Sequence, residues 1–348
     1  MYHAFYGIPS PSSPPPLSLL SPHLYNLHPP YLPPSPSNPP MYHGSILSPP
    51  HPPHPSSPPC SPLPSPCSPL PSPLLPAPLP PPIPPPSNSP MYHVFSYGID
   101  WLWVRRLTTN SPDDSPNTDS LKLLGVRHAL IENCTFHGGD DDVSLVARGS
   151  QAVANVTIRN LVATSGHGIS IGSLGAGGAV ACVSDVSFKD LILSDLSNGL
   201  RIKSWQGGLG VVRNVQYENV YMTNIERAIT LDQFYCDKNQ DFPCEPSPDN
   251  VALVNISYTD VYGTASKYAM DMECSDTVPC TGISLDNVKL GGTSSSTREP
   301  VFKNILSSHA AGDVAPLPKH MTSYEEWGVS TPTDEQVASI EEMMAKCT

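Results

Sequence analysis

A short strand pattern recurs along most of this chain and restricts its fold more than any other feature. Each copy begins with Asn, Asp or Gly and has apolar residues at its second and fourth positions. Asn or Asp follows at the sixth position and a third apolar residue at the seventh. The copies begin at Asn155, Asp185, Asn214, Asn255 and Gly282, which are 30, 29, 41 and 27 residues apart. The long interval contains Cys236 to Asp249, a segment with Pro and Cys that indicates an inserted surface loop. Strands that recur at such a period are typical of a solenoid.

A second series of short strands follows the first, so that each repeat carries at least two strands. Its members are Val143-Ser-Leu, Gly168-Ile-Ser-Ile, Gly199-Leu-Arg-Ile, Ala228-Ile-Thr-Leu and Ala269-Met-Asp-Met. Gly and Asn join these strands, and no helical periodicity intervenes. A β-sandwich would instead need antiparallel strands joined by hairpins and need not keep this register. We therefore expect an all-β, right-handed parallel β-helix, in which equivalent residues of successive coils lie about 4.8 Å apart.

Composition divides the chain into unequal parts. Of 45 prolines, 35 lie in the first 90 residues, and the first charged residue is Asp100. Proline lacks a backbone donor and fixes φ, so we expect residues 1–96 to be disordered, either as a polyproline II spacer or as an extension without a fold. Residues 97–310 then form the β-helix, and residues 311–348 form a tail. The tail is predicted to hold a short acidic helix with Thr331 as N-cap and Pro332 at its first position.

Charge and hydropathy exclude several classes of function. The formal net charge of −13 argues against binding to nucleic acid or to an anionic membrane. No apolar run approaches the roughly 20 residues that cross a bilayer. No secretory signal is expected either, because Leu17 to Leu20 is too short an apolar block. Nine cysteines and glycosylation sequons at Asn133, Asn155 and Asn255 nevertheless favour an oxidising compartment.

Charged and polar triplets stand beside the second strand series, one in each successive repeat. They are Asn117-Thr118-Asp119, Gly139-Asp140-Asp141, Gly166-His167-Gly168 and Arg201-Ile202-Lys203. Cleaving a glycosidic bond by one displacement needs a carboxylic acid for the leaving oxygen and a carboxylate for the attacking water. Three clustered aspartates can supply both roles, because their mutual repulsion keeps one of them protonated. Arg201 and Lys203 are two apart on a strand, so both side chains face the same way and suit a substrate carboxylate.

These four triplets, in this order, resemble the active-site signatures of polygalacturonases, glycoside hydrolase family 28. The surrounding segments 115–119, 165–174, 198–208 and 232–236 resemble the plant branch, and the resemblance covers about residues 97 to 305. It implies hydrolysis of α-1,4-linked galacturonic acid in pectin or polygalacturonan with inversion. It also implies a secreted, monomeric protein that needs no metal or organic cofactor.

The same resemblance implies a role for each site residue. Asp140 is expected to be the general acid, Asp119 and Asp141 to hold the water, and His167 to tune the protonation of the acid or to contact substrate. Substrate binding is expected at Arg201, Lys203, Tyr235 and Asn117.

Some positions depart from the family pattern. Ser120 stands where the family has Gly, which would constrain the turn if that position needs a positive φ. Asp142 replaces a cysteine whose usual partner falls near Ala163, so a disulfide that braces two catalytic coils is missing. We therefore expect a looser site, and Asp142 to add negative charge where a polyanion must approach.

The remaining cysteines are interpreted through the resemblance. It implies the pairs Cys236–Cys244 and Cys274–Cys280, each closing a short loop. Cys134 and Cys182 are expected to be buried small hydrophobic residues. Cys347 is expected to lack a partner.

Two alternative functions stay open. Family members have several coils before the Asn-Thr-Asp turn, whereas only about 20 plausible residues (97–116) precede it here. An inactive pectin-binding or wall structural protein would fit this difference, the lost disulfide and the proline tract. A calcium-dependent pectate lyase would share the solenoid but would cleave by elimination.

Overall fold

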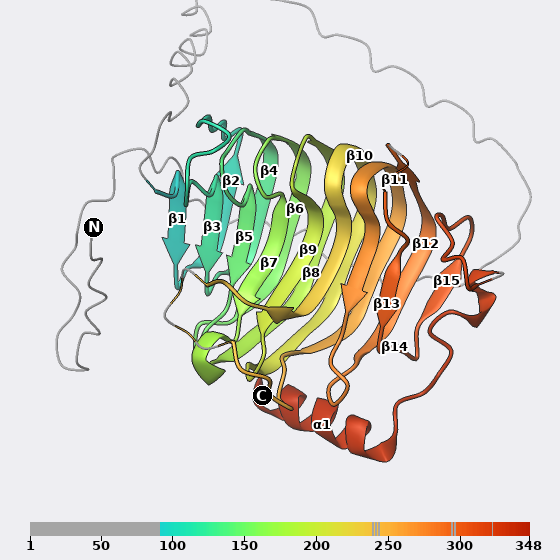
Figure 1. The fold of residues 1–348 in the computed structure, drawn as a ribbon. Helices are drawn as coiled ribbons and strands as arrows, with labels where there is room; N and C mark the ends of the chain where they lie inside the picture. The colour runs from blue at the N-terminus through green and yellow to red at the C-terminus, as the bar shows by residue number, and fades with distance from the viewer. Residues whose placement is uncertain are drawn as a thin grey trace, which may run out of the picture. The chain divides into compact units, whose positions relative to one another are not determined.

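A computed structural model of the chain describes residues 91–348, apart from 239, 241, 243, 294, 296 and 322. The prediction for the proline-rich segment therefore falls almost wholly outside the described residues. The strands of the described part all pair in parallel (Figure 1), which confirms the predicted parallel β-helix. The first of them begins at Val94, three residues before the predicted start of the β-helix. No helix in this part is long and apolar enough to span a membrane.

The strands stack in the two series that the sequence predicts. The first series consists of β2 (Asp100–Arg105), β4 (Arg127–Phe136), β6 (Val153–Thr164), β8 (Val180–Ser194), the first parts of β10 (Leu209–Tyr235) and β11 (Ala252–Glu273), then β12 (Cys280–Gly292), β14 (Ile305–Leu306) and β15 (His309–Ala311). The second consists of β1 (Val94–Tyr97), β3 (Leu121–Leu124), β5 (Val143–Val146), β7 (Ile169–Leu174), β9 (Asn198–Trp205), the last parts of β10 and β11, and β13 (Val301–Lys303).

The asparagines and aspartates of the repeat bend the chain inside the long strands of the first series. They adopt left-handed backbone angles, with φ of 51° at Asn160, 57° at Asp190 and 56° at Asn219. Among residues with a side chain, Asn and Asp tolerate this conformation best. Their side chains also hydrogen-bond from coil to coil, for example from Asn160 to Asn133 at 3.4 Å and from Asn224 to Asp195 at 2.8 Å. The periodic Asn/Asp positions are therefore ladder residues that hold the coils in register.

The interior is filled by stacks of equivalent apolar side chains. Phe188, Tyr217 and Tyr258 occupy one position in three successive coils, with ring centroids 4.8 and 5.0 Å apart. All three rings are almost fully buried. Because these spacings match the distance between paired strands, the stack adds side-chain contact to the backbone register.

The tail holds two helices. The 3-10 helix η2 (Tyr324–Glu326) precedes α1 (Asp334–Ala345), and a further 3-10 turn, η1 (Ala176–Gly178), follows β7. The N-cap of α1 is Thr333, which forms a capping box with Gln336, so the predicted cap at Thr331 is wrong. The helix starts two residues later because Thr333 and Gln336 satisfy each other's backbone donors, whereas Thr331 has no such partner three residues on.

Helix α1 is fixed to the side of the solenoid. Its Ile340 and Met343 pack in a cluster with Val211, Ala252 and Val278. The last turn returns to β8, where Cys347 forms a disulfide with Cys182 at a Cα–Cα distance of 5.5 Å. The predictions of a free Cys182 and an unpaired Cys347 are therefore wrong. Cys236–Cys244 and Cys274–Cys280 are paired as the resemblance implied, and Cys134 is free and buried.

Candidate active site

The predicted acidic residues lie in equivalent turns of adjacent coils. Asp119 precedes β3, Asp140 and Asp141 precede β5, and His167 precedes β7. Backbone hydrogen bonds tie these turns together: Ser120 N donates to Asp141 O at 3.0 Å, and His167 N donates to Asp140 O at 2.8 Å. The turns belong to the rigid stack, so the stacking of the coils fixes the spacing of the carboxylates.

Asp140 forms the centre of a dense hydrogen-bond group. Its Oδ1 lies 3.0 Å from His167 Nδ1 and accepts from Asp141 N at 2.8 Å, while its Oδ2 accepts from Asn117 N at 3.2 Å. Burial alone would raise the pKa of Asp140. The hydrogen bond and charge of His167, with the Asp141 amide and the charge of Lys203, outweigh burial and lower the pKa to about 2. The same hydrogen bond raises the pKa of His167, so a proton shared by the pair resides on the imidazole.

Asp141 is held by two buried partners. Ser170 Oγ donates to its Oδ1 at 2.7 Å, and Lys203 Nζ donates to its Oδ2 at 2.9 Å. The side chains of Asp141 and Lys203 are only 4% and 8% exposed. Lys203 comes from β9, two coils beyond Asp141, so this ion pair links coils that are not adjacent.

Asp119 has a different environment from Asp140. Its Oδ2 accepts from Lys122 Nζ at 3.0 Å, and its residue is 2% exposed. Burial raises the pKa of Asp119 to about 6; Lys122 opposes this rise, and the charges of Asp141 and Asp140 add to it. Asp119 thus takes up a proton more readily than Asp140.

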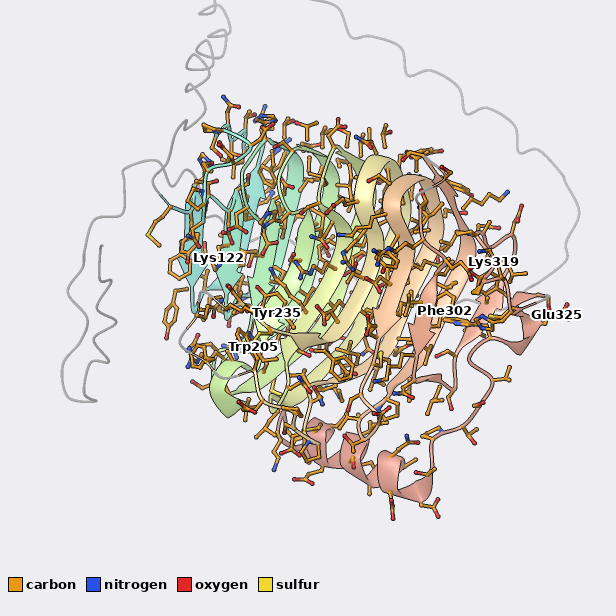
Figure 2. The ribbon with its side chains drawn as sticks, in the orientation of Figure 1. Lys122, Trp205, Tyr235, Phe302, Lys319 and Glu325 are labelled. Atoms are coloured by element: carbon orange, nitrogen blue, oxygen red, sulfur yellow. A yellow bond between two sulfur atoms is a disulfide. The ribbon has the colours of Figure 1, made fainter. Side chains whose placement is uncertain are left out.

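Basic and aromatic side chains border the carboxylates. Arg201 on β9 lies next to Ser170 in the strand register. Tyr235 is the last residue of β10 (Figure 2). The cationic groups of Arg201 and Lys203 lie 5.2 and 5.4 Å from the centroid of its ring. Burial raises the pKa of Tyr235 to about 12, so its hydroxyl remains a hydrogen-bond donor at physiological pH. The structure therefore brings all eight predicted site residues into one region, with Asn117 contributing through its backbone amide and its side chain exposed.

Sequence reasoning missed two members of this region, Ser170 and Lys122. Ser170 lies on β7 opposite Ser144 of β5, and the alternation of β7 could have placed it on the same side as the catalytic candidates. Lys122 follows Asp119 by three residues, and side chains at this spacing on a strand face opposite sides, so the sequence did not predict their contact.

Of the departures from the family pattern, the predicted surface charge of Asp142 is wrong, and the condition stated for Ser120, a positive φ, is not met. Ser120 keeps a negative φ and accepts a hydrogen bond from Thr109 Oγ1 at 2.7 Å, so serine fits this turn without strain. Asp142 does not add charge to the surface, because it is fully buried. Burial, reinforced by the charge of Asp141, raises its pKa well above the ordinary value and so favours the uncharged form. Asp142 Oδ2 also accepts from Gly168 N at 3.2 Å, which connects the two coils that the missing disulfide would have connected.

Three side chains of the site are close enough to one another to be tested as ligands of a metal cation. Ligand atoms of Asp140, Asp141 and His167 lie within 4.8 Å of one another. His167, however, is hydrogen-bonded to Asp140, and both oxygens of Asp141 are engaged by Ser170 and Lys203. The ammonium group of Lys203 would repel a cation from Asp141. The donor set therefore suits ion-pair and proton chemistry better than metal binding.

Comparison with known proteins identifies the family. Residues 86–311, more than half of the chain, match the model of Glycosyl hydrolases family 28. The chain belongs to glycoside hydrolase family 28. It is 38% identical over 235 residues to a polygalacturonase of Chamaecyparis obtusa, covering 67% of this chain and 44% of that protein. It is also 38% identical over 240 residues to polygalacturonase-2 of Solanum lycopersicum, covering 69% of this chain and 50% of that protein.

A solved family 28 structure has the same architecture. The polygalacturonase from Erwinia carotovora ssp. carotovora superposes with a TM-score of 0.53 at 26% sequence identity, covering 64% of this chain and 55% of that one. The chain spans about half the length of the curated relatives that it matches.

Proposed function

We propose that this family 28 chain hydrolyses the α-1,4-galacturonosidic bonds of pectin or polygalacturonan. The observation that carries the proposal is the placement of three aspartates, two of which (Asp119 and Asp140) have pKa values shifted in opposite directions, beside the Arg201–Lys203–Tyr235 group. Two carboxyl groups of different protonation are what acid/base cleavage of a glycosidic bond needs. A cationic pair beside them suits a polymer with one carboxylate on each sugar.

The roles follow the family pattern. Asp140 protonates the leaving oxygen, and a water held by Asp119 and Asp141 attacks the anomeric carbon from the opposite face, with inversion. Lys203 and Ser170 hold the carboxyl group of Asp141 in place. Arg201 and Tyr235 bind the sugar carboxylate and hydroxyls, while Asn117 N fixes the second oxygen of Asp140.

In the free protein the proton that His167 and Asp140 share lies on His167. His167 therefore serves as the proton reservoir of the acid: its Nδ1 proton moves to Asp140 Oδ1 along their hydrogen bond, and Asp140 then donates this same proton to the leaving oxygen, which leaves His167 neutral and Asp140 ionised. Since the pKa of Asp119 is about 6, its carboxylate form, which binds the water, prevails only above that pH. Activity should consequently fall as pH drops through about 6.

Release of reducing ends from de-esterified polygalacturonan tests the proposal, with Asp140→Asn compared against the unchanged chain. We expect hydrolysis by the chain and a loss of about 100-fold or more in the variant. Products with unsaturated ends would instead indicate a lyase. Retention on immobilised pectate without cleavage, by a folded protein, would indicate a pectin-binding protein and overturn the hydrolase assignment.

We place the protein outside the cell. Its relatives are plant polygalacturonases, and the described residues contain three disulfides, which form in oxidising compartments.

A further inference from the structure

Residues at the position equivalent to His167 in the following coils form a line along the solenoid. This line extends well beyond the coil of Arg201 and Lys203. The backbone oxygen of Asn198 lies against Gly168, so Asn198 follows His167 by one coil. Asn198 then pairs with Arg227, Arg227 with Tyr268, and Tyr268 with Arg298. At about 4.8 Å for each coil, Arg298 lies roughly 19 Å along the solenoid from His167.

The last three of these residues form one compact group. The guanidinium carbons of Arg227 and Arg298 lie 4.9 and 5.3 Å from the ring centroid of Tyr268. Arg298 Nη1 donates to the Tyr268 hydroxyl at 2.6 Å. Arg227 is ion-paired with Asp271, which is itself 5% exposed. Tyr268 thus has both arginines against its ring, and buried Asp271 anchors one of them.

The two arginines differ in charge balance. Asp271 neutralises Arg227, whereas no carboxylate of the described residues lies within ion-pair distance of Arg298, which is exposed. Its remaining N–H groups are therefore available for a bidentate partner.

Three acidic residues, Asp232, Asp271 and Glu273, lie on the coils between Arg201 and Arg298. Each of them has a cation beside it. Asp232 lies 4.0 Å from Arg201, Asp271 is ion-paired with Arg227, and Glu273 is paired in register with Lys303. Arg298 thus remains the unbalanced charge of this part of the surface.

We propose that Arg298, held by Tyr268 and backed by Arg227, is a distal subsite that binds the carboxylate of a galacturonate unit several sugars away from the cleaved bond. This inference rests on the proposed function, because it takes the bound polymer to run along the solenoid axis over the line that starts at the catalytic aspartates. A polyanion with one carboxylate on each sugar can reach Arg201 and Arg298 at the same time only if it is long. The subsite therefore makes the protein favour long chains over short ones.

The test compares binding of trimeric and octameric oligogalacturonates by calorimetry, using the full chain with Asp140→Asn to prevent cleavage. In this background we expect Arg298→Gln to weaken octamer binding about tenfold and to leave trimer binding within about twofold. Arg298→Lys should restore part of the octamer affinity, because it retains the charge but loses the bidentate geometry. Tyr268→Phe should weaken octamer binding less than Arg298→Gln, since it removes only the hydroxyl that orients Arg298.

Arg105→Gln is the matched control. Arg105 also lies over an aromatic ring, 5.5 Å from the centroid of Trp103, but it belongs to β2 of the other strand series. Its replacement should leave both affinities unchanged. Equal weakening of trimer and octamer by Arg298→Gln, or no effect on either, would overturn the subsite. Binding is measured without turnover, so the two proposals fail separately. Absence of hydrolysis by the unchanged chain would contradict the proposed function, whereas the binding of the octamer would still decide whether the subsite exists.

Discussion

The ammonium group of Lys122 lies 3.0 Å from the carboxylate of Asp119 and 4.4 Å from the ring centroid of Tyr92. The Asp119 side chain is 3% exposed, and that of Lys122 is 23% exposed. Lys122 is thus the closest positive charge to the carboxylate that we expect to hold the water. It limits how far burial and the neighbouring carboxylates raise the pKa of Asp119.

Replacing Lys122 should therefore move the acid limb of the pH–rate profile. In the unchanged chain we expect kcat/KM to fall as pH drops through about 6, where Asp119 becomes protonated. Lys122→Met removes the opposing charge, so the pKa of Asp119 rises and the fall begins about one pH unit higher. Lys189→Met, which breaks an ion pair with Glu218 on the other strand series, should leave the profile in place. An acid limb that stays fixed or moves to lower pH would contradict the role of Lys122.

The assignment of acid and base can be tested separately from activity. If Asp140 donates the proton, Asp140→Asn should retain more activity on an aryl galacturonide with a good leaving group than on polygalacturonan, since such a group needs little protonation. If Asp119 holds the water, added azide should partly rescue Asp119→Asn, because azide attacks without a general base. Products analysed by nuclear magnetic resonance would report both outcomes. The reverse pattern would exchange the two roles and would agree with the higher proton affinity of Asp119 in the free protein.

Sequence periodicity predicted the stack, and it indicated which candidate site residues lie close together, because both depend on local rules. A left-handed Asn such as Asn160, inside a long strand of the first series, is a backbone requirement, and the resulting register brings Asp119 close to Asp140 and Asp141. The pairing of Lys122 with Asp119 was not predictable in this way. Three residues apart on a straight strand, the two side chains would face opposite sides, and only the turn before β3 brings them together.

Long-range packing accounts for the other misses. The bond between Cys182 and Cys347 depends on where α1 docks, 165 residues further along the chain. The charge state of Asp142 depends on its complete burial. The one available signal was that the resemblance places a cysteine at this position, and cysteine is among the residues most often buried.

Breaking the ion pair of Lys203 and Asp141 should destabilise the fold as well as the site. Lys203→Met leaves a buried carboxylate without its cation, which costs about 3–5 kcal/mol. Asp141→Asn in the same chain should recover most of that loss, because the amide still accepts from Ser170. A double-mutant cycle by urea denaturation measures the coupling. Additive effects of the two substitutions would show that the pair contributes no coupling energy.

The disulfide of Cys182 and Cys347 should contribute to stability by closing a long loop. Cys347→Ser should lower the free energy of unfolding by about 2–5 kcal/mol and expose Ile340 and Met343 as α1 separates from the solenoid. Mass spectrometry after thiol labelling of the denatured, unreduced chain checks the bond itself. A label on Cys347 in the unchanged protein would contradict the pairing, and Cys134 serves as the positive control because it is free.

The buried carboxyl of Asp142 should make stability depend on pH in a definite direction. Its folded-state pKa lies well above the ordinary value of 3.8. Above pH 3.8 the unfolded chain loses this proton while the folded chain keeps it, so the contribution of Asp142 to stability declines as pH rises, until the folded-state pKa is reached. Asp142→Asn cannot ionise, and its carbonyl can still accept from Gly168. The variant should therefore melt close to the parent at pH 4 and progressively above it toward pH 8.

Comparing the two melting temperatures at each pH isolates Asp142, because the other carboxyl groups are common to both proteins. Asp114→Asn, which removes a carboxyl group at an exposed position, is the control for Asp142→Asn. A constant difference for Asp142→Asn would mean that Asp142 is ionised in the folded protein. In that case the link from its carboxyl to Gly168 N would be charge-assisted, and the variant would lose stability at neutral pH instead of gaining it.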